Sequence, residues 1–182
     1  MYLISAYFDE NTNKILKHLQ QRVADKTGND FMIRNNVMPH LTISAIEARN
    51  VDVLIPAFEK VCREELHTLE EKGVVNNTIN IVSVGQLFPR VIYAAPVFNE
   101  YMMNLSISIY NEFAIIPETN ISKFYQPYSW MPHITLGKCL DKEQMRQAFA
   151  VLQDLFMPID GRIAKIGLST VNPYREVMSV EL

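Results

Sequence analysis

One short stretch of this sequence occurs twice, and the repeat predicts how the chain is built. The two copies are Met38-Pro39-His40-Leu41-Thr42-Ile43-Ser44 and Met131-Pro132-His133-Ile134-Thr135-Leu136-Gly137. Methionine, proline, histidine and threonine hold the same offsets in both copies, and the inner positions between them are aliphatic. His133 follows His40 by 93 residues, about half of the 182-residue chain. A repeat at this distance predicts two similar halves.

The elements around each copy follow the same order. Apolar periodicity, turn residues and helix-start signals predict strand, helix, strand, helix, strand in each half, with two closing strands in the second half. In the first half the strands are 2–8, 39–46 and 74–87, with a bulge between Ile81 and Val82, and the helices start at Asp9–Asn13 and in the low 50s and end at Gly28 and Gly73. In the second half the strands are 91–95, 133–137, 159–171 and 176–182, and the helices are the stripe from Met102 to Phe113 and a helix that Asp141 and Gln144 open.

This order predicts an α+β fold of antiparallel-type sheet. We expect one domain, residues 1–182, in which two pseudo-symmetric lobes with outer helices surround a central cleft. The lobes are predicted to divide at about residue 89, into 1–88 and 89–182. We expect an irregular segment, 117–129, between the helix with the stripe from Met102 to Phe113 and the second motif.

Within each motif the histidine and the threonine are two residues apart. Successive side chains of a strand point to opposite faces, so His40 and Thr42 share one face while Leu41 points into a core. The same holds for His133 and Thr135. A histidine in an apolar strand is commonly a hydrogen-bonded core residue, but two copies at matched positions favour a functional role.

If the two lobes are related by an approximate two-fold, their histidines face each other. Two imidazoles that titrate near neutral pH can act as a base and an acid in one reaction. The Thr42 and Thr135 hydroxyls could then donate hydrogen bonds to the oxygens of a phosphate as charge develops on them. The reaction that fits is attack of water on a phosphodiester, above all a strained cyclic one. It requires neither metal nor cofactor.

The motifs Pro39-His40-Leu41-Thr42-Ile43 and Pro132-His133-Ile134-Thr135-Leu136 resemble those of the two-histidine (2H) phosphoesterase superfamily, which includes bacterial RNA 2′,3′-cyclic phosphodiesterases, also called 2′-5′ RNA ligases. The resemblance covers nearly the whole chain. It implies that His40 and His133 are the catalytic pair and that Thr42 and Thr135 hold the phosphate. Many RNA-processing relatives have an arginine just after the second motif, where this chain has Gly137-Lys138, so the substrate is less constrained than the reaction class.

Four further residues are candidates for substrate binding. Lys138 can supply a positive charge without the bidentate fork of arginine. Tyr128 lies in the irregular segment, where an aromatic ring can stack on a base, although such rings also pack loops. Phe88 and Arg90 lie at the junction of the lobes, where a ring and a cation can line the entrance of the cleft.

Composition excludes several classes of protein. Nine Phe and eight Tyr exclude a disordered chain, and no apolar run is long enough for a membrane helix. Asp9 and Glu10 interrupt the N-terminal apolar run, so we expect a cytoplasmic protein without a signal peptide. The net charge of −3 disfavours binding to long duplex nucleic acid, which leaves a nucleotide or a short RNA end as the partner. No protein partner is indicated.

The sequence therefore predicts a phosphodiesterase that hydrolyses a 2′,3′-cyclic phosphate or a 2′-5′ linkage on a nucleotide or RNA end, with ligation as the possible reverse reaction. An alternative is a module that binds the same ligands without hydrolysis. A metal hydrolase with histidine ligands is disfavoured, because no carboxylate or cysteine lies at ligand spacing from either motif.

Overall fold

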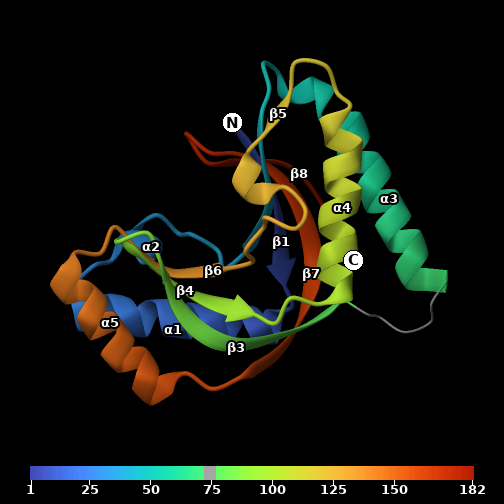
Figure 1. Cartoon of the computed structure of the whole chain (residues 1–182). Helices are drawn as coiled ribbons and strands as arrows, with labels where there is room; N and C mark the ends of the chain where they lie inside the picture. Colours follow the sequence, from blue (N-terminus) through green and yellow to red (C-terminus); the bar gives the residue numbers. More distant parts are fainter. Residues whose placement is uncertain (72–76) are drawn as a thin grey trace.

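The computed structural model describes residues 1–71 and 77–182, which form an α+β fold with an eight-stranded antiparallel sheet and five α-helices (Figure 1). The strands are β1 (Tyr2–Phe8), β2 (Leu41–Glu47), β3 (Thr78–Leu87), β4 (Val91–Pro96), β5 (Asn120–Ile121), β6 (Ile134–Lys138), β7 (Ile159–Thr170) and β8 (Arg175–Glu181). The helices are α1 (Glu10–Thr27), α2 (Phe31–Arg34), α3 (Ile55–Glu71), α4 (Glu100–Ala114) and α5 (Lys142–Leu155), with short 3-10 turns η1 (Val51–Val53) and η2 (Lys123–Tyr125).

The sheet runs in the order β5-β2-β1-β7-β3-β4-β6, and β8 also pairs with β7. Every pairing is antiparallel. The long strand β7 holds the two ends of the sheet together, because β3 pairs with its start, Ile159–Arg162, and β1 pairs with its later part, Ile163–Thr170. The two motif strands, β2 and β6, therefore lie far apart in the strand order, on opposite sides of β7.

The helices form two pairs, α1 with α5 and α3 with α4 (Figure 1). Helix α1 contacts β6 and β7, and α5 contacts β4, so this pair covers the part of the sheet that ends at β6. Helix α4 contacts β2 and β5, so the other pair covers the part that contains β2. Each motif strand is thus backed by a helix from the other half of the chain.

The helix ends carry the predicted signals. Asp9 caps α1 by accepting a hydrogen bond from the Thr12 backbone N–H at 3.0 Å, and Gly28 ends this helix with a φ of 67°, which a glycine adopts without strain. Asp141 and Gln144 form the predicted capping box of α5. These local interactions confirm where two helices begin.

The predicted bulge in β3 is confirmed, because the pairing with β4 shifts register between Ile81 and Ser83. Helix α2 and strand β5 were not expected. Both are very short, so local periodicity carries little signal for them. The predicted helix end at Gly73 and strand start at Val74 lie outside the described residues.

Candidate active site

The two motif histidines occupy matching local positions. His40 and His133 each come directly before the first residue of a motif strand, β2 and β6. The Nδ1 atom of His40 is 2.7 Å from the carbonyl oxygen of Met38, and Nδ1 of His133 is 2.9 Å from that of Met131. A carbonyl oxygen only accepts, so Nδ1 carries the proton in each neutral ring. Within the described part of the chain neither Nε2 atom has a hydrogen-bond partner, so each is the ring nitrogen that can take or give a proton.

The residues that follow each histidine alternate as predicted. Leu41 and Ile43 are 0% and 1% exposed and belong to the core, as do Ile134 and Leu136 in the second motif. The threonine between each aliphatic pair, Thr42 or Thr135, is half-buried and faces away from that core.

Side-chain donors from other elements bind the backbone of both motif threonines. The indole Nε1–H of Trp130 donates to the carbonyl oxygen of Thr42 at 2.9 Å, and the Gln20 side chain donates to that of Thr135 at 3.0 Å. Trp130 precedes His133 by three residues. The structure therefore joins the first motif directly to the segment that carries the second.

The electrostatics of His40 also connect the two motifs. Loss of hydration is the largest influence on His40 and lowers its pKa, although the ring remains partly accessible. The hydrogen bond to Met38 acts in the opposite direction, and the charges of His133 and Lys138 lower the pKa further. The groups around His40 thus favour its neutral form. Two of them belong to the second motif segment, because His133 directly precedes β6 and Lys138 is its last residue.

A tyrosine ring lies beside each histidine. The rings of Tyr7 and His40 have centroids 6.0 Å apart and are tilted by 42°, and those of Tyr93 and His133 are 5.7 Å apart at 66°. Tyr7 comes from β1 and Tyr93 from β4, the strands that pair with β2 and β6. The sequence prediction missed both tyrosines, because their approach depends on which strands pair.

Glycines make room for both rings. A Cβ atom at Gly85 would collide with the hydroxyl end of Tyr93, and one at Gly167 would lie 3.0 Å from Cε2 of Tyr7. Gly85 pairs with Tyr93 across β3 and β4, and Gly167 pairs with Ser5 across β7 and β1. Each ring can therefore lie over the strand next to its own.

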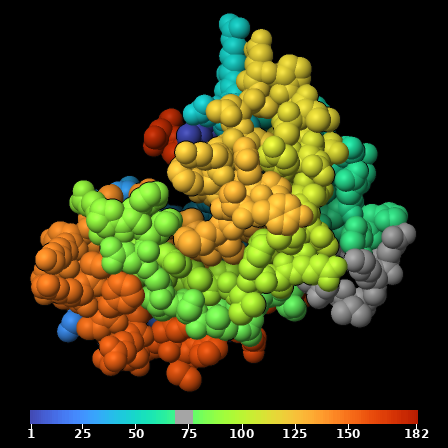
Figure 2. Space-filling model, viewed as in Figure 1, coloured from blue at the N-terminus to red at the C-terminus, as the bar shows by residue number. Residues whose placement is uncertain are grey.

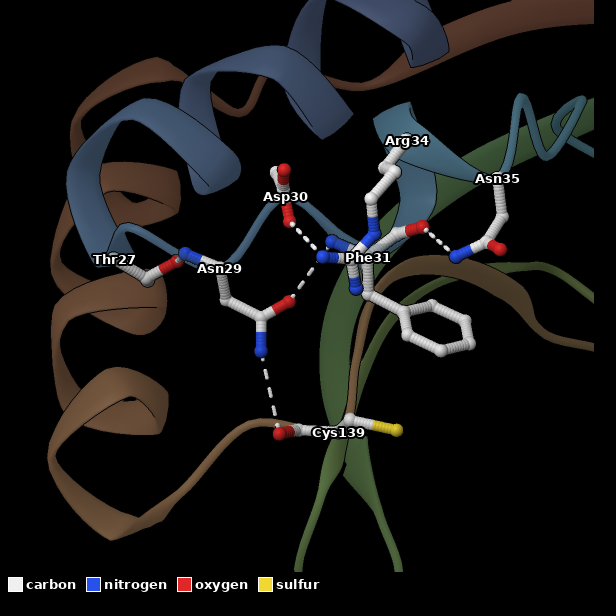
Figure 3. A network of polar contacts seen from close by, with 7 residues as sticks. All are labelled: Thr27, Asn29, Asp30, Phe31, Arg34, Asn35 and Cys139. Carbon is white, nitrogen blue, oxygen red and sulfur yellow. Dashed lines mark hydrogen bonds and ion pairs between the residues drawn. The ribbon is translucent and has the colours of Figure 1, made fainter.

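Lys138 is the predicted binding residue whose charge acts on His40, where it lowers the pKa. Its Nζ lies 5.9 Å from the centroid of the Phe31 ring. Figure 3 shows how the loop between α1 and α2 is held at the start of α2: the Asn29 side chain accepts from the Phe31 backbone N–H at 3.1 Å and donates to the carbonyl of Cys139 at 3.3 Å. The loop before the first motif is thereby fixed to the residues directly after the second.

Phe88 and Tyr128 lie in exposed loops. Their exposed fractions are 70% and 83%, and both have left-handed backbones, with φ of 51° and 67°. Bulky side chains rarely adopt this conformation. Figure 2 shows a hollow in the surface between the green turn that joins β3 to β4 and the gold segment that precedes β6. Phe88 belongs to the turn and Tyr128 to the segment.

The Arg90 side chain is bound to the backbone that follows β6. Its guanidinium donates to the carbonyl of Cys139 at 3.0 Å and to that of Leu140 at 3.4 Å. It lines a cavity of about 520 Å³ against α5, together with Asp141, Lys142 and Arg146 among others. A second cavity of about 500 Å³ lies near Asp9 and Arg162. Neither cavity is lined by a motif histidine or threonine.

Within residues 1–71 and 77–182, no three histidine, cysteine, aspartate or glutamate side chains gather closely enough to hold a metal ion. In the same part of the chain, no helix combines the length and the apolar character that crossing a bilayer needs.

No protein-family model matches this chain, and no curated protein is significantly similar to it in sequence.

Proposed function

We propose that this protein is a metal-independent phosphodiesterase that opens a 2′,3′-cyclic phosphate, or cleaves a 2′-5′ linkage, on a nucleotide or a short RNA end. The observation that carries the proposal is the matched pair of His-x-Thr segments. Each histidine has its Nδ1 bound to a backbone carbonyl and its Nε2 free, and Trp130 joins the two segments through Thr42.

The strand pairing supports two pseudo-symmetric lobes around this site. The order β2-β1-β7-β3-β4-β6 reads the same from either end if β2 corresponds to β6, β1 to β4 and β7 to β3. The register agrees: Leu41 pairs with Ala6 as Ile134 pairs with Ala94. On this interpretation each lobe contains a strand from the other half of the sequence, and the hollow in Figure 2 is the cleft between the lobes.

In the proposed reaction a water oxygen attacks the phosphorus atom of the cyclic phosphate. One histidine takes a proton from the water at Nε2 as the new P–O bond forms. The other histidine, which starts as imidazolium, gives its proton to the ribose oxygen as the old P–O bond breaks. The product is a phosphomonoester, and proton exchange with solvent restores the two histidines. The same sequence, with a hydroxyl of another RNA end attacking the phosphorus in place of water, would join two ends. The reverse of that step, in which the ribose hydroxyl attacks and the other RNA end leaves, would cleave a 2′-5′ linkage and re-form the cyclic phosphate.

The threonines and Lys138 supply the charge stabilisation of this proposal. The Thr42 and Thr135 hydroxyls donate to the non-bridging oxygens, whose negative charge increases as the attack proceeds. Lys138 adds a positive charge near His40, consistent with the lower pKa that its charge gives that residue. Loss of one such hydroxyl is expected to lower kcat about 100-fold or more.

The test is hydrolysis of nucleoside 2′,3′-cyclic phosphates and of short 2′-5′ and 3′-5′ oligonucleotides in excess chelator. We expect turnover by the natural protein and a loss of several orders of magnitude in His40→Ala and in His133→Ala. Thr42→Val and Thr135→Val should be impaired, and the corresponding serine variants should keep much of the activity because they keep the hydroxyl.

His18→Ala is the matched control, because His18 is exposed on α1 and outside both motifs. Retained activity in either motif-histidine variant would contradict the mechanism. Tight binding of these ligands without turnover would instead identify the module that only binds, and activity that disappears with chelator would point to a metal hydrolase.

A further inference from the structure

A second tyrosine extends the site on the side of His40. The hydroxyl oxygens of Tyr7 and Tyr174 are 2.9 Å apart, and the Tyr7 ring lies beside the ring of His40. Tyr7 is 6% exposed, whereas Tyr174 is 61% exposed and lies in the turn between β7 and β8. One end of the Tyr174 side chain is thus fixed while much of its surface is open to solvent.

Polar residues of β7 and β8 brace this pair of tyrosines. Nζ of Lys165 lies 4.7 Å from the centroid of the Tyr7 ring and 3.1 Å from Oε2 of Glu176. The Ser179 hydroxyl donates to the other oxygen of Glu176 at 2.9 Å. Burial, followed by the hydrogen bond to Tyr174, raises the pKa of Tyr7, so its hydroxyl stays protonated at physiological pH.

The His133 side is built differently. There the hydroxyl end of Tyr93 lies over Gly85, and within the described part of the chain no second tyrosine is bonded to it. Within residues 1–71 and 77–182, strand β8 pairs only with β7 and has no counterpart next to β3. An exposed ring anchored to the site is therefore found beside His40 alone among the described residues.

We propose that Tyr174 is the platform on which the nucleobase of the substrate stacks, so that the base lies on the β7–β8 side of the cleft and the cyclic phosphate lies at the histidines. This inference rests on the proposed phosphodiesterase function and gives the substrate an orientation. In a nucleotide the ribose separates the base from the 2′,3′-phosphate. In the protein the Tyr7 side chain lies between Tyr174 and His40, because its hydroxyl reaches the hydroxyl of Tyr174 and its ring lies beside the ring of His40.

The physical reason for this assignment is preorganisation. A ring that is already held at its hydroxyl loses little freedom when a base stacks on it, so more of the stacking energy remains as affinity. Stacking on a protein ring tolerates any base, because every base has a π-face. The proposed subsite therefore selects nucleotides over other cyclic phosphates without selecting one base.

The experiment compares ligands with and without a base. Adenosine 2′-monophosphate and methyl riboside 2′-monophosphate are titrated by calorimetry into the natural protein and into Tyr174→Leu. We expect Tyr174→Leu to weaken binding of the adenosine ligand on the order of tenfold and to leave the methyl riboside ligand unchanged. Tyr174→Phe keeps the ring but loses the hydrogen bond to Tyr7, so its affinity for the adenosine ligand should lie between those of the natural protein and Tyr174→Leu. Phe149→Leu removes a partly exposed ring on α5 and should change neither ligand.

Equal affinity of the natural protein and Tyr174→Leu for the adenosine ligand would overturn the subsite. So would an equal loss for both ligands, because Tyr174 would then act on the cleft rather than on the base, and so would failure of the natural protein to bind the adenosine ligand. Hydrolysis of the two corresponding 2′,3′-cyclic phosphates separates this result from the function. Turnover with an unchanged base preference in Tyr174→Leu refutes the subsite alone, and base-dependent binding without turnover refutes the hydrolase alone.

Discussion

Trp130→Phe removes the hydrogen bond that joins the two motif segments. The indole N–H reaches the Thr42 carbonyl at 2.9 Å, and its ring is 7% exposed and meets Phe98 edge to face, with centroids 5.7 Å apart. Phenylalanine keeps an aromatic contact with Phe98 but has no donor. The carbonyl of Thr42 then loses its side-chain partner.

The expected loss of stability has two parts. Loss of the partner of this part-buried carbonyl costs about 1–3 kcal/mol. The smaller ring leaves a void in its packing, which adds about 1 kcal/mol. The sum, about 2–4 kcal/mol, is a large share of the roughly 5–15 kcal/mol that stabilises a domain, yet the variant should still fold. It corresponds to a fall of about 1–2 M in the midpoint of urea unfolding.

Unfolding should be followed by far-ultraviolet circular dichroism, because Trp130 is the single tryptophan and its fluorescence is lost in the variant. Gln20→Met is the matched control, since it removes the donor to the carbonyl of Thr135 without separating the motifs. Both variants should be destabilised, but only Trp130→Phe should also weaken the influence of His133 on the pKa of His40, measured by NMR. A loss below about 0.5 kcal/mol in Trp130→Phe would refute the reasoning, because the Thr42 carbonyl would then be solvated rather than dependent on the indole.

Three further outcomes follow from the site. Because the pKa of His40 is lowered in the folded protein, the stability that its neutral form contributes is complete above the unfolded value of about 6.5 and is lost as the pH falls through the folded pKa; urea midpoints across this window should vary less in His40→Gln. Lys138→Met removes a positive charge that disfavours the imidazolium, so NMR titration should show a higher pKa for His40, and a lower one would contradict the assigned proximity. Gly85→Ala should push the Tyr93 ring out of its place and destabilise the fold by about 1–3 kcal/mol, with changed ring shifts of His133 in NMR spectra; unchanged shifts would show that the ring has room to move.

Much of the fold follows from local signals in the sequence. The helix caps depend on residues close together in the chain, as do the alternating side chains of the motif strands. The sequence therefore predicts the caps at Asp9 and Asp141 directly. Strand order is different. That β1 and β3 both pair with β7 depends on contacts between residues far apart in the chain, and no local period records them.

The same distinction separates the predicted from the unpredicted parts of the site. The repeat identifies His40 and His133, because two matched copies need no knowledge of the partner strands. The tyrosines beside them do not repeat in this way. By register Tyr93 lies opposite Thr135, whereas the residue opposite Thr42 is Ser5, so the two rings approach their histidines from positions that do not correspond. A comparison of the two halves of the sequence therefore does not align Tyr7 with Tyr93.

This difference between the halves has a chemical consequence. A repeated motif supplies two like histidines, but acid–base catalysis needs two unlike ones, a neutral base and a charged acid. The distinction must come from residues outside the repeat. Around His40 these residues are Lys138 and Tyr7. The charge of Lys138 disfavours the imidazolium form of His40. The ring of Tyr7 already has a cation, the ammonium of Lys165, at 4.7 Å from its centroid. On the proposed mechanism the repeat provides the reacting groups, and the parts of the sheet that break the symmetry set the direction in which the proton moves.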